Sequence, residues 1–370
     1  MNAVLLGYGT VGKGVEKLVK NVEGLKLKQV FVLPQFEDLP YFSNDGLSMV
    51  TAPDTDIVFE CLSGTEPSNT LITAALKAGK HVITSNKATV APNLERYMAL
   101  CEAHGGTLQI EASVAGGIPF LDAILKLQKL EELDGYEGIF NGTSNFILDQ
   151  MQTAGMDFDT ALKQAQSLGY AEADPSNDVE GMDVWYKTNI TNMLAYHTHN
   201  DGLRKPLGIS KLTVEDIDLA RRHGKVIRHI SRSVQKDDKY ASLIAPAFLE
   251  QGDYLANVPS NYNAQLIYAP SFDKLGYFGQ GAGQLATAQA MLANAVDTME
   301  GRERPICLSD HKKQDDSLLQ EKWLFRTEAD LSGFGLRRLE GNYWLSDPAD
   351  ATLADAVLEK DPGALAALWR

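Results

Sequence analysis

The sequence predicts an α/β fold, with one domain built on a parallel sheet and a second, α+β domain built on a mixed sheet. Between residues 2 and 111, short apolar strand-like segments alternate with helical segments, which is typical of a parallel sheet with right-handed crossovers. Between residues 136 and 269, strand-like segments recur without that regular alternation. From residue 301 onward, a charged linker, a hairpin signal and one helix predict a small C-terminal α+β extension.

A glycine-rich turn follows the first predicted strand, Asn2–Leu6. The turn reads GYGTVG, and apolar residues then recur at helical spacing as far as Val19. Between a strand and a helix, such glycines allow a tight turn, a close approach of backbone to a pyrophosphate, and close packing of the helix on the strand. The pattern predicts a Rossmann-type domain, although glycine-rich turns also occur in other α/β domains. The candidate cofactor-binding residues are Gly7, Gly9, Thr10, Val11 and Gly12.

The end of the second predicted strand, residues 26–33, leaves the choice between NAD and NADP open. NAD enzymes often carry an acid there for the ribose, whereas NADP enzymes carry a nearby Arg. This chain has Pro34 and Gln35, with Glu37 and Asp38 slightly later, and no Arg. The missing Arg slightly favours NAD or dual use.

The predicted strand–helix alternation continues with elements at 56–61, 68–78, 81–84, 92–104 and 107–111. Ligands of such sheets bind beyond the carboxyl ends of the strands. Ser85 and Lys87 follow the strand at 81–84, so we expect them near the cofactor. A second glycine run, residues 279–283, precedes a predicted helix that ends at Met299. It resembles the first run in kind, so Gly281 is a further cofactor-binding candidate.

A small, glycine-rich loop, Glu111–Phe120, leaves the predicted sheet. Its bends expose backbone carbonyls close together. With the Glu111 carboxylate, these oxygens can ligate a hard monovalent cation. A tight connection between domains is the alternative interpretation.

The stretch from Gly169 to Lys187 combines several carboxylates with one amine. Its acids are Glu172, Asp174, Asp178, Glu180 and Asp183. A helix is predicted to begin near Asn177, with Glu180 completing a capping box. On that helix Asp183 and Lys187 stand at i and i+4 and share a face. The stretch therefore offers carboxylates that can hold a cationic group and an amine that can move a proton; a solvated loop with a surface ion pair is the alternative.

A predicted strand at 136–140 breaks at the segment NGTSN, residues 141–145, where a helix begins. Small hydroxyl residues there can cap the helix, or their backbone N–H groups can hold a carboxylate or an amide. Strands predicted at 226–231, 242–249 and 263–269 complete a mixed sheet, whose apolar face could serve as a dimer surface.

Composition and charge exclude several classes of protein. The chain has 370 residues, enough for two or three domains, and 44% of them are apolar. Its formal net charge of −15 does not fit a nucleic-acid partner, which needs clustered Lys and Arg. No apolar run approaches the ~20 residues of a membrane helix. The three cysteines, Cys61, Cys101 and Cys307, are far apart and predict reduced thiols in a cytoplasmic protein.

Six segments in this order resemble the homoserine dehydrogenases, and the resemblance runs from residue 1 to about residue 300. They are GYGTVG, TSNKATVA, EASVAGGIP, GIFNGTSNFIL, LGYAEADPSNDVEGMDVWYK and GQGAGQLATAQA. The resemblance implies an oxidoreductase that reduces L-aspartate 4-semialdehyde to L-homoserine with NADPH or NADH. It also implies a homodimer that binds a small amino-acid substrate. The domains expected are 1–112 with 272–300 for the dinucleotide, 113–271 for substrate binding and dimerisation, and 301–370 for the extension.

The resemblance also implies a role for individual residues. Lys187 would donate a proton to the aldehyde oxygen, Asp183 would orient it, and Lys87 would lie near the nicotinamide and the substrate oxygen. Glu172 and Asp178 would hold the substrate ammonium. The other implied substrate contacts are Tyr170, Gly142 and Thr143. The implied sodium site consists of Glu111 and the backbone carbonyls of Val114, Gly116 and Ile118.

Two alternatives remain open at this point. Another NAD(P)-dependent amino-acid or semialdehyde dehydrogenase could use the same scaffold. An aspartate-semialdehyde dehydrogenase needs a nucleophilic cysteine, however, and Cys61 and Cys101 lie in a predicted strand and helix. A dinucleotide-sensing scaffold protein is the alternative that is not an enzyme. Many members of the resembling family carry a regulatory domain at the C-terminus, but the tail here is short, so we do not expect feedback inhibition by threonine.

Overall fold

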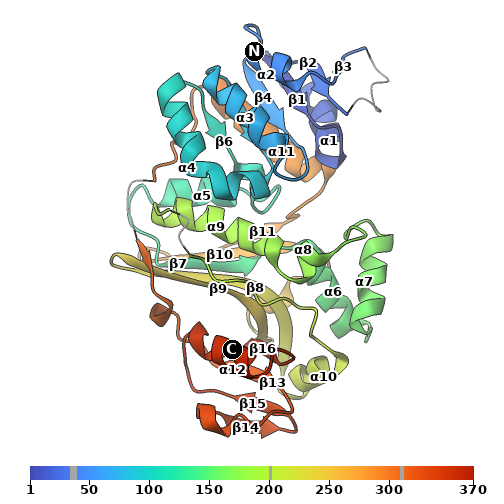
Figure 1. The fold of residues 1–370 in the computed structure, drawn as a ribbon, viewed down its shortest axis with the longest axis vertical. Coiled ribbons are helices and arrows are strands. Elements are labelled where there is room, and N and C mark those ends of the chain that lie inside the picture. The colour runs from blue at the N-terminus through green and yellow to red at the C-terminus, as the bar shows by residue number, and fades with distance from the viewer. Residues whose placement is uncertain (34–39, 200–201, 309–311) are drawn as a thin grey trace. The chain divides into compact units, whose positions relative to one another are not determined.

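The computed structural model describes residues 1–33, 40–199, 202–308 and 312–370, and the chain forms two compact units (Figure 1). Unit 1 comprises Met1–Lys129 and Gln280–Ser309, and unit 2 comprises Leu130–Gly279 and Asp310–Arg370. The boundaries predicted after residues 112, 271 and 300 therefore differ from those of the structure. The acidic positions Glu37 and Asp38, with Pro34 and Gln35, lie outside the described residues.

The sheet of unit 1 is parallel throughout and has the strand order β3-β2-β1-β4-β5-β6. Its strands are β1 Asn2–Leu6, β2 Lys26–Phe31, β3 Phe42–Ser43, β4 Ile57–Glu60, β5 His81–Thr84 and β6 Leu108–Gln109. This order reverses direction next to β1, as in doubly wound dinucleotide-binding folds. The predicted parallel sheet is confirmed, and the glycine-rich turn lies at the carboxyl end of its central strand.

Helices surround this sheet. They are α1 Thr10–Val19, α2 Gly46–Thr51, α3 Ser68–Lys77, α4 Lys87–His104, α5 Phe120–Leu127 and α11 Gln284–Met299. The predicted start of α4 at residue 92 is wrong, because the Asn86 side chain caps the helix by accepting the N–H of Thr89 at 3.2 Å, and Pro92 lies inside it. A Cβ on Gly14 would lie 2.2 Å from the Gln284 carbonyl oxygen, so α1 and α11 pack at backbone contact.

Residues 113–129 belong to unit 1 rather than to the second domain because local contacts hold them there. A Cβ on Gly116 would lie 2.5 Å from the Gly281 carbonyl oxygen, and the Gly117 N–H donates to the Gln280 carbonyl at 3.2 Å. The loop before α5 thus packs directly on the loop before α11. Unit 1 resumes at Gln280 because the preceding residues form a strand of unit 2.

Unit 2 contains a mixed sheet of ten strands among the described residues, in the order β11-β10-β7-β8-β9-β16-β13-β15-β14, with β12 paired to β9. The strands are β7 Gly135–Ile139, β8 Lys225–Lys236, β9 Lys239–Glu250, β10 Asn263–Ala269, β11 Asp273–Gly279, β12 Lys313–Gln314, β13 Trp323–Arg326, β14 Arg337–Glu340, β15 Tyr343–Leu345 and β16 Leu365–Trp369. The pairings of β9 with β12 and β16 are parallel, and the others are antiparallel. The prediction of a mixed sheet is confirmed.

The helices of unit 2 are α6 Gly142–Thr153, α7 Phe158–Ser167, α8 Ser176–Val179, α9 Met182–Tyr196, α10 Val214–Arg222 and α12 Ala351–Lys360. A layer of buried polar side chains joins α9 to the sheet: Thr188 contacts Ser231 at 2.8 Å, and the Asn192 amide donates to Ser242 at 3.0 Å. None of the described helices combines the length and the apolar character needed to cross a bilayer.

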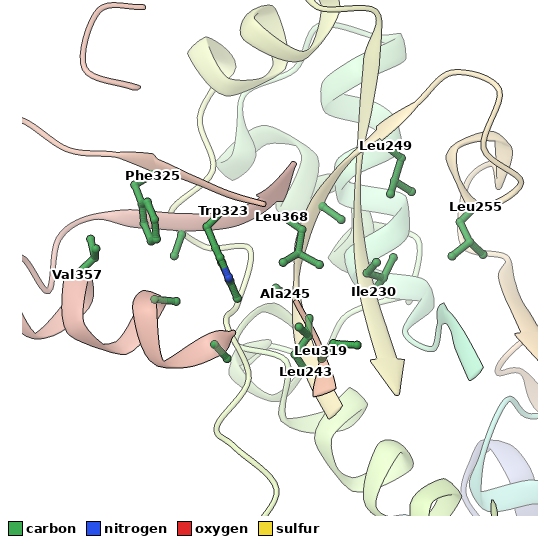
Figure 2. Packing of buried hydrophobic residues seen from close by; sticks show 14 of the residues in the cluster. Ile230, Leu243, Ala245, Leu249, Leu255, Leu319, Trp323, Phe325, Val357 and Leu368 are labelled. Atoms are coloured by element: carbon green, nitrogen blue, oxygen red, sulfur yellow. The ribbon is translucent and has the colours of Figure 1, made fainter. Parts of the chain in front are cut away.

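The C-terminal residues continue the sheet of unit 2 and do not form a separate extension. Strand β16 pairs in parallel with β9, and α12 packs against the same strands. Figure 2 shows Trp323, Phe325 and Val357 in one buried cluster with Ile230 and Leu243 of the central strands. The predicted hairpin around Gly341 is confirmed by the antiparallel pairing of β14 and β15.

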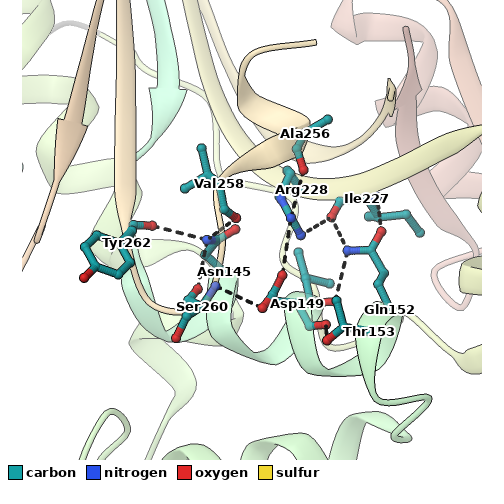
Figure 3. A network of polar contacts seen from close by, with 11 residues as sticks. Asn145, Asp149, Gln152, Thr153, Ile227, Arg228, Ala256, Val258, Ser260 and Tyr262 are labelled. Atoms are coloured by element: carbon teal, nitrogen blue, oxygen red, sulfur yellow. Dashed lines mark hydrogen bonds and ion pairs between the residues drawn. The ribbon is translucent and has the colours of Figure 1, made fainter. Parts of the chain in front are cut away.

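Helix α6 is fixed to the sheet by polar contacts along its length (Figure 3). The buried Asn145 amide donates to the carbonyls of Val258 and Ser260 at 3.1 and 2.9 Å. The Arg228 guanidinium contacts Asp149 at 3.5 Å and the Ala256 carbonyl at 2.9 Å. Burial lowers the pKa of Arg228, and the Asp149 carboxylate opposes that shift. These contacts hold the N-terminal end of α6 in place.

Candidate active site

The glycine-rich turn of unit 1 has the geometry that its sequence predicts. Gly7 has a φ of +95°, and a Cβ there would lie 3.0 Å from the Cys61 carbonyl oxygen. A Cβ on Gly12 would lie 2.1 Å from the Gly7 carbonyl oxygen, so only glycine allows α1 to approach β1 this closely. Both positions therefore require glycine for packing.

The N-terminus of α1 has no side-chain cap among the described residues. Gly9 is the N-cap, and within the described part of the chain a Cβ on Gly9 would meet nothing within 4 Å. Thr10 is exposed and Val11 is half-buried. Backbone N–H groups at a helix N-terminus favour phosphate groups, so these residues fit the pyrophosphate of a dinucleotide.

A buried carboxyl group organises the ends of β4 and β5. Glu60 is fully buried; it accepts the Leu62 N–H at 2.8 Å and the Thr84 hydroxyl proton. The Thr84 hydroxyl in turn accepts the Asn86 N–H at 2.9 Å. Burial raises the pKa of Glu60. Our sequence analysis missed this residue, although an acid at the end of an apolar strand was a signal.

The hydrogen bonds around Glu60 and Asn86 position Ser85 and Lys87, the cofactor-binding candidates at the end of β5. The Ser85 N–H donates to the Glu60 carbonyl at 3.2 Å, and Lys87 is the first residue of α4. Asn86 also donates to the carbonyls of Leu62 and Gly64, at 3.1 and 2.7 Å. Ser85 and Lys87 thus lie at the junction between β5 and α4, where these hydrogen bonds fix the backbone at the carboxyl edge of the sheet.

The predicted cation loop contains a buried carboxyl group. Glu111 accepts the backbone N–H groups of Leu121 and Asp122 at 3.2 and 2.6 Å, at the start of α5. Burial raises its pKa to about 8. In the described part of the chain, Glu111 forms no ion pair, and no group of three or more His, Cys, Asp or Glu side chains could hold a metal ion.

The predicted cation ligands of this loop are oxygen atoms, the ligands that hard cations take. Each carboxylate oxygen has two lone pairs, so one remains on each after the backbone bonds of Glu111. Gly116 has a φ of +57°, and the Ile118 carbonyl accepts the Phe120 N–H at 2.8 Å. Val114 is buried in the same turn. A hard cation with oxygen ligands would compensate the charge of Glu111 when this group is ionised.

In unit 2, the acidic stretch forms two helices rather than one. The short α8 ends at Val179, and α9 begins after Gly181, which has a φ of +83°. A helix begins at Ser176, beside the predicted start near Asn177, but Pro175 is its N-cap and no described side chain caps it, so the predicted capping box with Glu180 is wrong. A Cβ on Gly181 would lie 3.0 Å from Cε1 of His229, so the chain turns against a buried imidazole there.

Lys187 and Asp183 form a buried ion pair on α9, as their spacing predicted. The Lys187 Nζ lies 2.7 Å from Oδ2 of Asp183, and both side chains are less than a tenth exposed. The same ammonium donates to the Phe140 carbonyl at 2.6 Å. The surface ion pair considered from the sequence is thus excluded. The neighbouring His229 has its pKa lowered to about 4 by burial.

The start of α6 lies beside this pair. The Asn141 amide donates to Oδ1 of Asp178 at 2.7 Å and to Oδ2 of Asp183 at 2.8 Å. Our sequence analysis gave Asn141 no role in the site. A Cβ on Gly142 would lie 2.6 Å from the Asn261 carbonyl oxygen, so this position needs glycine.

Two loop residues predicted to contact substrate are also tied to α6. The Thr143 hydroxyl donates to the Tyr170 carbonyl at 2.6 Å, and the Tyr170 ring packs edge-on against Phe146. Tyr170 is 39% exposed, and Glu172 is exposed. Unit 2 therefore brings together Lys187, Asp183, Asp178, Gly142, Thr143 and Tyr170, while the Glu172 carboxylate extends toward solvent.

Comparisons with known proteins agree with these features. A family model described as "Homoserine dehydrogenase, NAD binding domain" matches residues 7–110, and one described as "Homoserine dehydrogenase" matches residues 119–296. The homoserine dehydrogenase of Corynebacterium glutamicum is 34% identical over 314 residues, which cover 79% of this chain and 70% of that protein.

Solved structures show the same fold. A homoserine dehydrogenase from Thiobacillus denitrificans superposes with a TM-score of 0.88 at 27% identity, over 100% of this chain and 98% of that chain. A hyperthermophilic archaeal homoserine dehydrogenase in complex with NADPH has a TM-score of 0.69 at 21% identity, over 82% of this chain and 98% of that chain. With a dinucleotide-binding turn, a buried lysine–carboxylate pair and these matches over most of its length, the chain belongs to the homoserine dehydrogenase family.

Proposed function

We propose that Lys187 is the proton donor in the reaction of this family, the reversible reduction of L-aspartate 4-semialdehyde to L-homoserine in threonine and methionine biosynthesis. The observation that carries the proposal is the position of the Lys187 ammonium. It is buried, lies 2.7 Å from Asp183 and donates to the Phe140 carbonyl. These two contacts hold the amine of Lys187 in one place, beside a carboxylate that favours an ammonium.

The chemistry requires such a group. An aldehyde carbon accepts hydride only if the charge developing on its oxygen meets a proton or a cation. The reduced nicotinamide supplies the hydride when it is bound. Lys187 would stabilise the oxygen and then protonate it, and Asp183 would keep the ammonium oriented. In the reverse direction Lys187 would take the proton from the homoserine hydroxyl.

We infer that Glu172 and Asp178 hold the ammonium of the amino-acid substrate. Glu172 lies in the loop before α8 and Asp178 lies within α8, and a carboxylate is the natural partner of an ammonium. Gly142 and Thr143 would contact the substrate from the N-terminus of α6, with Tyr170 beside them. The bond from Thr143 to the Tyr170 carbonyl, at 2.6 Å, supports this grouping.

For the dinucleotide, we propose pyrophosphate contacts from Gly7, Gly9, Thr10, Val11 and Gly12. Ser85, Lys87 and Gly281 would complete the site, with Lys87 near the nicotinamide. We further propose that the enzyme accepts both NAD and NADP. No Lys or Arg occurs between Lys28 and Lys77, where a 2′-phosphate partner would be expected, yet the archaeal homologue of known structure was solved with NADPH.

We propose that sodium binds the loop before α5 through Glu111 and the carbonyls of Val114, Gly116 and Ile118. The support is a buried carboxylate without a cationic side chain of its own among the described residues. The ion would act on the structure of this loop, and no chemical step needs it. The homodimer and the cytoplasmic location stay predictions, and sedimentation of the purified protein tests the first.

An absorbance assay at the nicotinamide band tests the proposed function. Homoserine would be supplied with NAD and then with NADP, each in sodium chloride and in choline chloride at equal ionic strength. We expect reduction of both dinucleotides. Malate and glutamate serve as controls, and turnover of either in preference to homoserine would contradict the proposal.

A further inference from the structure

Asn141 lies where β7 ends and α6 begins, and it is 4% exposed. Its side-chain oxygen caps α6 by accepting the Ser144 N–H at 2.7 Å. A backbone N–H can only donate, so this bond fixes which end of the amide faces the helix. The amide nitrogen must therefore face the other way, toward the acidic stretch.

Both hydrogens of that nitrogen are used by carboxylates. One goes to Oδ1 of Asp178 at 2.7 Å, and the other goes to Oδ2 of Asp183 at 2.8 Å. The same Oδ2 of Asp183 receives the Lys187 ammonium at 2.7 Å. One amide thus joins a carboxylate proposed to bind the substrate ammonium to the carboxylate that orients the proposed proton donor.

The neighbouring backbone strengthens this link. Phe140, which immediately precedes Asn141, accepts a second bond from the Lys187 ammonium at 2.6 Å. The end of β7 therefore contacts the proton donor through the Phe140 carbonyl and contacts its carboxylate through the Asn141 side chain. A shift of this strand end would move both groups together.

The electrostatics require a neutral donor at this point. Two carboxylates that approach the same atom repel each other, and a buried carboxylate without a donor loses the hydrogen bonds that water would provide. A cationic side chain here would compete with the substrate ammonium for Asp178. An amide supplies two hydrogen bonds without a net charge, so it adds no cation that would compete with the substrate.

We propose that Asn141 is a positioning residue for the reaction: it fixes the distance between the ammonium-binding carboxylate Asp178 and the proton donor Lys187. This inference rests on the proposed roles of those two residues. An α-amino acid substrate has its ammonium and its reacting oxygen at a limited separation. Holding Asp178 and Asp183 on one amide matches the protein to that separation.

The test replaces the two donors and keeps the helix cap. Serine and aspartate are both good N-cap residues, so the variants Asn141→Ser and Asn141→Asp retain the acceptor for the Ser144 N–H. Asn141→Ser loses the amide bonds to both carboxylates, and Asn141→Asp in addition places a third acid beside them. The control is Asp157→Ser at the N-cap of α7, where Asp157 accepts the Thr160 N–H at 2.8 Å at an exposed position.

We expect Asn141→Ser to lower kcat for homoserine oxidation by roughly tenfold and to raise the KM for homoserine by a similar factor, since each lost bond involves a charged acceptor. The KM for the dinucleotide should not change. Asn141→Asp should lower kcat and raise the KM for homoserine by larger factors. Asp157→Ser should keep the kinetics of the wild type while its thermal midpoint falls slightly.

The inference is overturned if Asn141→Ser keeps the wild-type kcat and homoserine KM, because the residue would then act as a helix cap alone. Far-UV circular dichroism and the dinucleotide KM show whether each variant is folded. If Asn141→Ser is not folded, Asn141→Asp decides, since it preserves size and cap. Failure of the proposed function has a different signature: the wild type would not oxidise homoserine, or removal of Lys187 would leave turnover unchanged.

Discussion

Two buried carboxyl groups lie at the start of a helix, one in each unit, and their surroundings differ. Asp183, at the start of α9, pairs with the Lys187 ammonium at 2.7 Å and accepts a hydrogen bond from the Asn141 amide. Glu111, before α5, accepts two backbone N–H groups, and across the described residues it has no cationic partner.

From this difference we propose that Asp183 serves the chemistry and that Glu111 serves the structure. Burial raises the pKa of Glu111 to about 8, because backbone dipoles do not replace the water that the charged form loses. A carboxylate with its own ammonium needs no added ion, whereas we expect a bound cation to stabilise the ionised form of Glu111. We therefore expect changes at Asp183 and Lys187 to affect turnover, and changes at Glu111 to affect stability and its dependence on sodium.

The largest effect is expected when the ammonium of Lys187, the partner of Asp183, is removed. Lys187→Ala should lower kcat by about 10²–10⁴-fold, the range over which general acids contribute, and should keep dinucleotide binding. Stopped assays of homoserine oxidation and fluorescence titration with NADPH measure the two quantities. Lys187→Arg is the matched control: it keeps the charge and the pairing with Asp183 but donates a proton poorly, so it should be folded and slow. Near-normal turnover of Lys187→Ala would remove this lysine from the mechanism.

A smaller effect is expected at Glu172, the exposed carboxylate in the acidic stretch before α9. Glu172→Gln should raise the KM for homoserine by roughly tenfold, because a hydrogen bond between charged groups contributes about 1.5–3 kcal/mol and solvent weakens it at this exposed site. The kcat should change little. Asp174→Asn, on the same loop, is the control, since Asp174 is exposed and accepts the Ser176 N–H at 3.1 Å. An unchanged KM in Glu172→Gln would contradict its role at the ammonium.

The smallest effect is expected at Glu111, and it concerns the stability of the folded protein. Between its ordinary value of 4.5 and about 8, Glu111 holds a proton in the folded state that it has lost in the unfolded state. The unfolded state then binds fewer protons, so stability falls as the pH rises through this window. A bound cation favours the carboxylate and should reduce the loss. At pH 9 we expect a Tm higher by roughly 2 °C or more in sodium chloride than in choline chloride.

Glu111→Gln sharpens this prediction because it has no charge to compensate. Its Tm should respond less to pH between 5 and 9 and should not distinguish sodium from choline. Identical behaviour of the variant and the wild type would show that Glu111 binds no ion.

Much of the fold could be predicted because its elements carry local signals. The bounds of β1, β5 and β10 match the predicted segments, and the glycine-rich turn lies where the strand and helix patterns placed it. Strand β11 was missed because its residues are largely exposed, so it lacks the apolar run of a buried strand. Strand β16 was missed because its pairing with β9 joins residues far apart in the chain, which no local pattern reveals.

The site could be predicted where its residues lie on one helix, close together in the sequence. It could not be predicted where the fold brings distant residues together. Asp183 and Lys187 are one helical turn apart, so their spacing predicted the pair. Asn141 meets Asp183 from 42 residues away, and this contact depends on the end of β7 lying beside α9. The break at Gly181 also depends on a distant residue, because the buried ring of His229 fills the space beside it.

The most direct test is a crystal structure of the enzyme with homoserine and an oxidised dinucleotide. The account predicts that Nζ of Lys187 lies within hydrogen-bond reach of the homoserine hydroxyl oxygen, at about 2.6–3.2 Å, while Asp178 contacts the substrate ammonium. A hydroxyl oxygen bound to another group, with Lys187 paired only to Asp183, would contradict it.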